Sequence, residues 1–292
     1  MDEDLEPEKV YARALDPIHI GAGGYRLGRA DNTIVREPST DVPKIPGTSI
    51  AGVIREFYTI HLAEKKCEGK SDKEKRRCAE EEAKSIFGDE NKKGILRFYD
   101  GQIIFFPVSS IQGTVWITTK ELLKYWFGKE IETSENENRI YTIKGDPKKP
   151  LNLGWLLFEV ESPKSGEVEL PEEIKGWIKK AVIVPEKLFS PIVNDNLEVR
   201  TSVKIDSETG TAAEGALFTY EAIPRGTIFG FEIAEDKQSK DENQKIAKKI
   251  LKTISPYFEY LGVGGMATRG FGRLELNTEH SSKEGGTRDV KP

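Results

Sequence analysis

Apolar and polar residues alternate in several stretches of the chain, and this period of two is typical of strands with one buried face. The first stretch covers residues 10–20, with His19 expected on its polar side. The most regular one covers residues 197–223, where two alternating segments flank Asp206 to Gly210, residue types that favour a turn. The pattern therefore predicts a strand near the N-terminus and a long β-hairpin in the last third of the chain.

Other stretches repeat apolar residues at three- and four-residue spacing, as one face of a helix does. The first such stripe covers residues 50–57, with Thr48 or Ser49 expected as the N-cap. Pro256 is expected to end or kink the last helix, and residues 128–150 to form a loop or a weak peripheral hairpin. We also expect helices over residues 120–127, 171–180 and 246–254, and strands over 94–108, 115–118, 156–160, 181–184 and 273–276.

The order of these elements is that of a split β-α-β arrangement, with strand, helix, strand and strand first and helix then strand at the end. We therefore expect an α+β fold with a ferredoxin-like palm, which is also the RRM-like scaffold, carrying insertions that include the long hairpin. A single elaborated domain over residues 1–277 describes this pattern better than two independent domains. Residues 61–94 carry 19 charges in 34 positions and are expected to form a charged helical insertion, and residues 278–292 a disordered tail.

The charge balance limits the ways in which this chain can bind nucleic acid. Its 44 basic and 49 acidic residues leave a net charge of -5, which excludes a polybasic coat and requires local basic strips instead. No apolar run reaches the ~18 residues of a membrane span, and the acidic start of the chain lacks the apolar segment of a secretory leader. We expect a cytoplasmic protein without a membrane partner.

The two cysteines, Cys67 and Cys78, lie within the charged insertion. They can form one disulfide or remain free, and a reducing cytosol favours two free thiols. No second pair exists to complete a four-cysteine zinc site.

Two glycine-rich segments lie close to arginines, at residues 21–28 and 262–272. Gly262 to Ala267 matches the letters of a dinucleotide-binding fingerprint, but a helix precedes it and a strand follows, the reverse of the order that this motif needs. Glycine loops can still aim backbone N–H groups at phosphates without a helix. An enzyme that binds a small phosphate ligand therefore remains an alternative function.

Several motifs resemble those of RAMP proteins, the RNA-binding subunits of CRISPR effector complexes. The N-terminal motif comprises Ile18 to Gly23, Asp31, Arg36 to Pro38 and Ile45 to Arg55, and the C-terminal glycine loop covers Gly264 to Gly272. The middle of the chain is similar to the backbone subunit of type III-B Cmr complexes, in Phe106 to Gly113, Val115 to Thr118 and the thumb-like segments Asp206 to Thr211, Glu214 to Phe218 and Ile223 to Thr227. One departure is Ala51, where many relatives carry a lysine.

This resemblance implies an endoribonuclease that binds CRISPR guide RNA, stacks with further copies of itself and with other Cmr subunits, and cleaves complementary single-stranded target RNA at regular intervals. It implies a divalent metal ion, Mg or Mn, as the cofactor. Asp31 matches the RNA-cleaving aspartate of the family and is the expected metal ligand, while His19 and Glu221 are expected to assist catalysis. A guide RNA scaffold without cleavage remains the alternative within this class.

The expected RNA contacts combine positive charge with backbone amides. Ordinary capping or surface charge is the alternative for Lys44, Ser49, Arg55 and Arg200, and a plain tight turn is the alternative for the glycine loop. The residues are Arg36, Lys44, Ser49, Arg55, Arg200, Gly264, Gly265 and Arg269.

Overall fold

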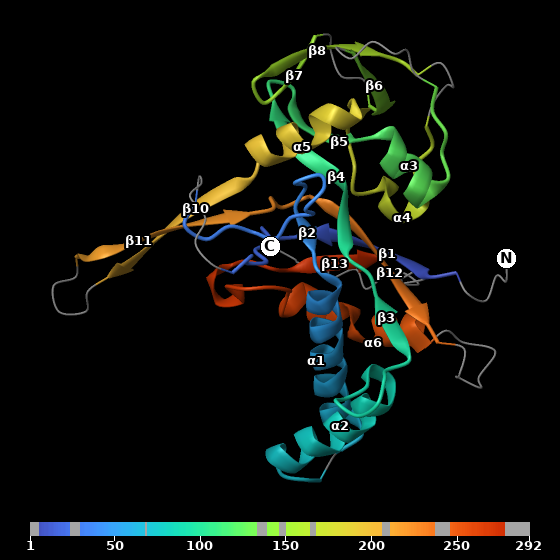
Figure 1. The fold of residues 1–292 in the computed structure, drawn as a ribbon, viewed down its shortest axis with the longest axis vertical. Coiled ribbons are helices and arrows are strands. Elements are labelled where there is room, and N and C mark those ends of the chain that lie inside the picture. The colour runs from blue at the N-terminus through green and yellow to red at the C-terminus, as the bar shows by residue number, and fades with distance from the viewer. Residues whose placement is uncertain are drawn as a thin grey trace, which may run out of the picture.

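A computed structural model describes residues 6–23, 30–67, 69–132, 139–145, 150–163, 168–205, 211–236 and 246–277. Within these residues, eleven strands form one large mixed sheet, helices cover it, and a two-stranded hairpin projects from it (Figure 1). The expected hairpin turn from Asp206 to Gly210 and the expected tail over 278–292 lie outside the described residues. None of the helices in the described segments has the length and apolarity needed to span a bilayer.

Four strands form the central part of the sheet in the order β13-β1-β12-β4, and each adjacent pair is antiparallel. Helices α1 and α6 cover one face, where Phe57 of α1 meets Phe258 of α6 edge-on at 5.1 Å between ring centroids. The bounds are β1 (Glu8–Ala14), β2 (Lys44–Ile45), α1 (Gly47–Lys65), α2 (Asp72–Phe87), β3 (Leu96–Phe98), β4 (Gly101–Ser110), β12 (Ile228–Glu235), α6 (Ile246–Tyr260) and β13 (Leu274–Asn277).

Strand β4 continues beyond the central strands and carries the sheet into an upper part, seen above β4 in Figure 1. A Cβ on Gly230 of β12 would come within 2.5 Å of Ile104 and 2.8 Å of the Trp126 ring, so the glycine lets α3 pack directly on the sheet. The remaining bounds are β5 (Gly113–Thr118), α3 (Lys120–Phe127), β6 (Arg139–Lys144), β7 (Leu151–Leu153), β8 (Leu156–Glu161), α4 (Glu172–Lys175), β9 (Ala181–Ile183), α5 (Glu186–Asp195) and the 3-10 turn η2 (Ala267–Arg269).

The two alternating segments of residues 197–223 form the expected pair of strands, β10 (Glu198–Ile205) and β11 (Ala212–Ala222). In their register Thr201 lies opposite Thr219. The base of the hairpin is joined to the body of the protein by two backbone hydrogen bonds between Ile18 and Ile223, at 2.8 and 2.9 Å. The hairpin is therefore anchored at its base and extends away from the sheet (Figure 1).

Three local expectations for the first third of the chain were wrong. Strand β1 ends at Ala14 and not at residue 20, because Pro17 cannot donate a ladder hydrogen bond. His19, expected on a polar face, is only 7% exposed. Helix α1 begins at Gly47, and the carboxylate of Asp100 accepts the Gly47 N–H at 2.7 Å, so neither Thr48 nor Ser49 is needed as the N-cap.

Later elements also differ from the sequence pattern. Helix α4 covers only Glu172–Lys175 of the expected 171–180, and residues 128–150 contain β6, a strand of the main sheet. Pro256, expected to end or kink the last helix, does not end it: α6 continues to Tyr260, and Phe258 beyond the proline is buried against Phe57.

The charged segment is helical as expected, but its cysteines are joined. Helix α2 folds back along the end of α1, which brings the Cα atoms of Cys67 and Cys78 to 6.4 Å and allows the disulfide between them. The expectation of free thiols was therefore wrong. It rested on the cellular compartment, whereas the pairing follows from the packing of two consecutive helices against each other.

Replacing both cysteines by serine should lower the free energy of unfolding by about 2–3 kcal/mol, because the disulfide closes a loop across a separation of 11 residues. Thermal unfolding of the wild type with and without reductant, beside Cys67→Ser/Cys78→Ser, measures this. Reduced wild type and the double variant should melt at the same lower temperature. A wild-type melting temperature that does not change after both thiols are shown by mass to be reduced would contradict the prediction.

Candidate active site and nucleic-acid interface

Residues 30–36 run beside the base of the hairpin and pair with strand β11. Asn32 N–H donates to the Thr219 carbonyl at 3.0 Å, and Glu221 N–H donates to the Asn32 carbonyl at 2.9 Å. These two bonds form a parallel bridge between Asn32 and Tyr220. The loop that contains Asp31 is thereby held against the strand that contains Glu221, although the two are far apart in the sequence.

Asp31 is exposed, and Thr219 holds one of its carboxylate oxygens. Oδ2 accepts hydrogen bonds from the Thr219 backbone N–H and hydroxyl, both at 2.8 Å. Both bonds hold the pKa of Asp31 below its ordinary value, and the bond from the backbone N–H lowers it more than the bond from the hydroxyl. The carboxylate is therefore ionised at neutral pH. No hydrogen bond from a described residue reaches Oδ1, which is the oxygen that Asp31 can offer to a bound molecule.

His19 lies next to this loop and is buried. Its Nδ1 is 2.7 Å from the Glu221 carbonyl, and because a carbonyl only accepts, Nδ1 carries the proton in this bond. The lone pair of a neutral His19 ring is therefore on Nε2. The ring meets Tyr220 edge-on at 5.8 Å between centroids, so His19 is oriented from two sides.

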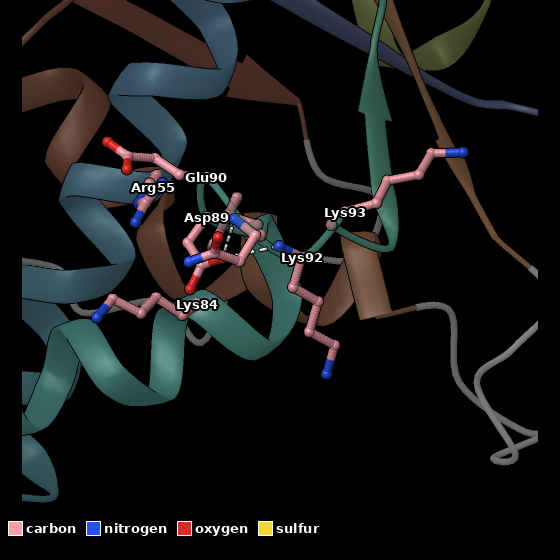
Figure 2. Close-up of a pocket in the computed structure, with 10 residues that line it drawn as sticks. Arg55, Lys84, Asp89, Glu90, Lys92 and Lys93 are labelled. Carbon is pink, nitrogen blue, oxygen red and sulfur yellow. Dashed lines mark hydrogen bonds between the residues drawn. The ribbon is translucent and has the colours of Figure 1, made fainter.

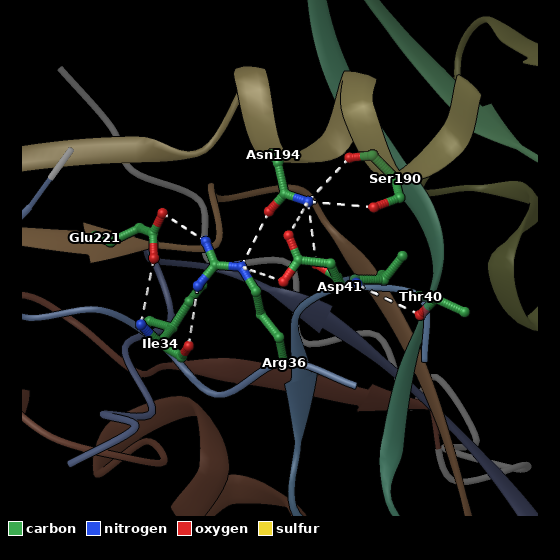
Figure 3. A network of polar contacts seen from close by, with 8 residues as sticks. Ile34, Arg36, Thr40, Asp41, Ser190, Asn194 and Glu221 are labelled. Atoms are coloured by element: carbon green, nitrogen blue, oxygen red, sulfur yellow. Dashed lines mark hydrogen bonds and ion pairs between the residues drawn. The ribbon is translucent and has the colours of Figure 1, made fainter. Parts of the chain in front are cut away.

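The side chains of Glu221 and Arg36 form an ion pair inside the protein (Figure 3). Glu221 accepts from Arg36 Nη2 at 2.6 Å and from the Ile34 backbone N–H at 3.3 Å, so both of its carboxylate oxygens are used. Arg36 also donates to Asn194 of α5 at 3.1 Å and to the Ile34 carbonyl at 3.1 Å. The side chains of Arg36 and Glu221 are only 14% and 7% exposed. The pair thus links the loop, β11 and α5.

The last glycine loop contacts the same place. Gly265 N–H donates to the His19 carbonyl at 3.0 Å. Gly264 has a φ of +78°, and a Cβ there would come within 2.5 Å of the same oxygen. The close approach of the loop to His19 therefore requires a residue without a side chain at position 264.

Two cations and two aromatic rings lie together at the hairpin base. Arg200 is opposite Tyr220 in the register of the hairpin, so their side chains share one face. The guanidinium of Arg200 is 4.7 Å from the centroid of the Phe271 ring. Arg269 donates to the Tyr220 hydroxyl at 3.2 Å and lies over its ring. Positive charges beside an aromatic ring are suited to RNA phosphates and bases.

Three of the expected RNA-binding residues lie outside this cluster. Lys44 is bonded to Asp100 at 2.6 Å and to Glu37 at 2.9 Å, and these bonds, with Asp100 the stronger, raise the pKa of Lys44. Ser49 is half-buried in the first turn of α1. Arg55 lines a charged groove beside the turn that follows α2, together with Lys84 and Asp89 (Figure 2).

The structure therefore gathers His19, Asp31, Arg36, Arg200, Glu221, Gly264, Gly265 and Arg269 in one region, and leaves out Lys44, Ser49 and Arg55. Thr219, Tyr220 and Asn194 are further members that the sequence analysis did not identify. The only sequence signal for the first two is the alternation of the hairpin. Among the described residues no three side chains of His, Cys, Asp or Glu are close enough to form a metal cage.

Comparison with known proteins gives a match to the family model of the RAMP superfamily over residues 11–275. The chain is 29% identical to the CRISPR system Cmr endoribonuclease Cmr4 of Pyrococcus furiosus, over 94% of this chain and 96% of that protein. Similar solved structures include the type III-B Cmr-beta complex bound to cognate target RNA, with TM-score 0.69 and 19% identity over 93% of this chain and 96% of the other. Oligomeric Cmr4 from Pyrococcus furiosus gives TM-score 0.60 and 21% identity over 94% and 100%.

Replacing Gly264 by Ala should lower the free energy of unfolding by about 1–3 kcal/mol, because the new methyl group meets the His19 carbonyl in a backbone conformation that alanine disfavours. Gly265→Ala is the matched control, since the nearest atom to its Cβ would be 3.6 Å away. That variant should stay within about 0.5 kcal/mol of the wild type. Chemical unfolding measures both, and equal effects at the two positions would contradict the prediction.

Proposed function

The chain belongs to the RAMP superfamily, and we propose that it is the backbone subunit of a type III-B CRISPR Cmr complex, which binds guide RNA and cleaves complementary target RNA. Nearly the whole of this chain aligns with nearly the whole of an endoribonuclease of such a complex. The observation that carries the proposal is the exposed, ionised Asp31 beside the basic and aromatic base of the hairpin. In this proposal the partners of the protein are guide RNA, single-stranded target RNA, further copies of this chain and other Cmr subunits.

In this proposal the four central strands with α1 and α6 are the palm, a ferredoxin-like arrangement within one elaborated domain. The hairpin of β10 and β11 is the thumb that sets the interval between cuts. The strand order β13-β1-β12-β4, with α1 after β1 and α6 before β13, supports the palm assignment. The projection of the hairpin away from the sheet supports the thumb assignment (Figure 1).

RNA binding is assigned to the exposed side of the hairpin base. Arg200, which also pairs with Glu198, and Arg269 supply positive charge to phosphates. Tyr220, which lies opposite Arg200 in the hairpin and under Arg269, supplies a ring for a base. A local site of this kind reconciles RNA binding with a net charge of -5. The backbone of Gly264 and Gly265 lies next to it through the contact with His19, which gives the glycine loop a place in the RNA site.

Cleavage is assigned to attack of a ribose 2′-hydroxyl on the adjacent phosphorus, which forms a cyclic phosphate as the bond to the 5′-oxygen of the next nucleotide breaks. The 2′-hydroxyl gives up its proton, and the leaving 5′-oxygen takes one up to become a hydroxyl, so no proton is gained or lost overall. This reaction requires the attacking oxygen to be in line with the leaving oxygen. Oδ1 of Asp31, which no described residue donates to, can accept the hydrogen bond of the hydroxyl and so orient it. His19 is assigned a supporting role, because its ring is buried and fixed by the Glu221 carbonyl and Tyr220.

A divalent ion, Mg or Mn, is part of this proposal, with Asp31 as its protein ligand. A single exposed carboxylate fits such an ion, because Mg²⁺ commonly takes one or two carboxylates and completes its shell with water and phosphate oxygens. When bound, the ion would neutralise charge that develops on the phosphate.

Glu221 and Arg36 take a different role from the one that the sequence suggested. Each uses its charged atoms on the other and on the loop backbone, so we assign them to holding the Asp31 loop and not to contact with RNA.

The proposal is tested by Asp31→Asn in complexes assembled with guide RNA. The asparagine oxygen can still accept both hydrogen bonds of Thr219, so the loop should keep its fold. Cleavage of matched RNA in a single turnover should fall by at least ~100-fold, the scale of one lost catalytic contact. RNA affinity should stay equal or rise slightly, because one negative charge is removed near the phosphates.

Asp89→Asn is the matched control, because Asp89 is also exposed and its pKa is also lowered by backbone N–H groups, here those of Asn91 and Lys92. It should cleave at the wild-type rate. Wild-type cleavage by Asp31→Asn would remove Asp31 from the active site and favour a guide-binding scaffold. Loss of RNA binding would show that the loop holds RNA.

A further inference from the structure

The Thr219 hydroxyl forms two hydrogen bonds with Asp31. It donates to Asp31 Oδ2 at 2.8 Å and accepts the Asp31 backbone N–H at 2.9 Å. The Thr219 backbone N–H donates to the same Oδ2 at 2.8 Å. One threonine therefore sets both the backbone position and the side-chain direction of Asp31.

Without these bonds nothing else in the described structure would orient the carboxylate. Asp31 is exposed, and an exposed aspartate in water exchanges between rotamers. The two bonds go to Oδ2, and no hydrogen bond from a described residue reaches Oδ1. Because threonine is branched at Cβ, its own side chain has few alternatives on a strand.

Thr219 is itself held in place by the contacts of β11 with the loop. Its carbonyl accepts the Asn32 N–H at 3.0 Å, and two residues further along β11 the buried Glu221 holds Ile34 and Arg36. The loop is thus attached to β11 at Asp31 and Asn32, and again at Ile34 and Arg36. A small displacement of the carboxylate is opposed by the whole base of the hairpin.

We infer that Thr219 is a positioning residue for RNA cleavage, which acts by holding Asp31 with Oδ1 toward the reacting ribose. This inference rests on the proposed function of Asp31. Thr219 is half-buried, and its hydroxyl already donates to and accepts from Asp31, so the effect passes through Asp31 and not through contact with RNA.

The test uses substitutions that separate the hydroxyl from the shape of the side chain. Thr219→Val keeps the shape and removes the hydroxyl, and its single-turnover cleavage should fall by at least ~10-fold, because misplacement of a reacting group by about 1 Å costs up to ~100-fold. Thr219→Ser restores the hydroxyl and should return cleavage to within about threefold of the wild type. Guide RNA affinity, measured by titration, should be the same in all three proteins.

Thr201→Val is the matched control. Thr201 lies directly opposite Thr219 in the hairpin and is exposed, but none of the hydrogen bonds found in the described structure joins it to the loop. It should cleave at the wild-type rate. If Thr219→Val does not assemble with guide RNA, the comparison is made between Thr219→Ala and Thr219→Ser.

Combination with Asp31→Asn separates this inference from the proposed function. If Thr219 acts through Asp31, Thr219→Val should add no further loss in the Asp31→Asn protein. Slow cleavage by Asp31→Asn with wild-type cleavage by Thr219→Val would overturn the inference and leave the proposed function in place. Wild-type cleavage by Asp31→Asn would overturn both. A valine defect that serine does not restore would show a packing role only.

Discussion

The pairing of the loop over residues 30–36 with the base of β11 is the contact on which the candidate site depends. The backbone bridge sets the register, and the pair of Arg36 and Glu221 secures it from the buried side. Two largely buried charges are stable there because each is matched and hydrogen-bonded, whereas either one alone would lack both water and a partner. Their contribution is to fix one arrangement of the loop, in which the carboxylate of Asp31 is exposed and that of Glu221 is not.

This arrangement separates two carboxylates that are close in space and equal in chemistry. Glu221 uses both oxygens on Arg36 and Ile34, while Asp31 uses one oxygen on Thr219 and, within the described part of the chain, keeps the other available. The arginines of this region are divided in the same way between buried and exposed positions. Arg36 is used inside the protein, whereas Arg200, over Phe271 and paired with Glu198, and Arg269, over Tyr220, are more exposed. An acidic chain can therefore present a small basic surface, since the field near a few side chains is not set by the net charge.

Helix α2 of the charged segment depends on other interactions for its stability. The ion pairs of α2, such as Arg76 with Glu56 and Glu80, are exposed and contribute little to stability. The helix buries few apolar residues of its own. The disulfide between Cys67 and Cys78 compensates for this, because it limits the freedom of the unfolded segment where a core is too small to do so.

Much of the fold could be predicted from local pattern. The hairpin, the helix stripe of α1 and the helix α3 at Lys120–Phe127 follow from alternation or from three- and four-residue spacing. Strand β12 was not identified, because its first four residues are buried on both faces and so show no alternation. Helix α5 was missed as well, although it supplies Asn194 to the loop network.

By itself, the sequence determined the residue types of the site and most elements that carry them, since both depend on neighbours along the chain. Only the tertiary structure decided which partner each charge has. Arg36 and Glu221 look as available in the sequence as Arg269 and Asp31, and Thr219 is indistinguishable there from Thr201. Burial and hydrogen bonding between segments nearly 190 positions apart separate these roles, because such contacts depend on the assembled fold and not on local spacing.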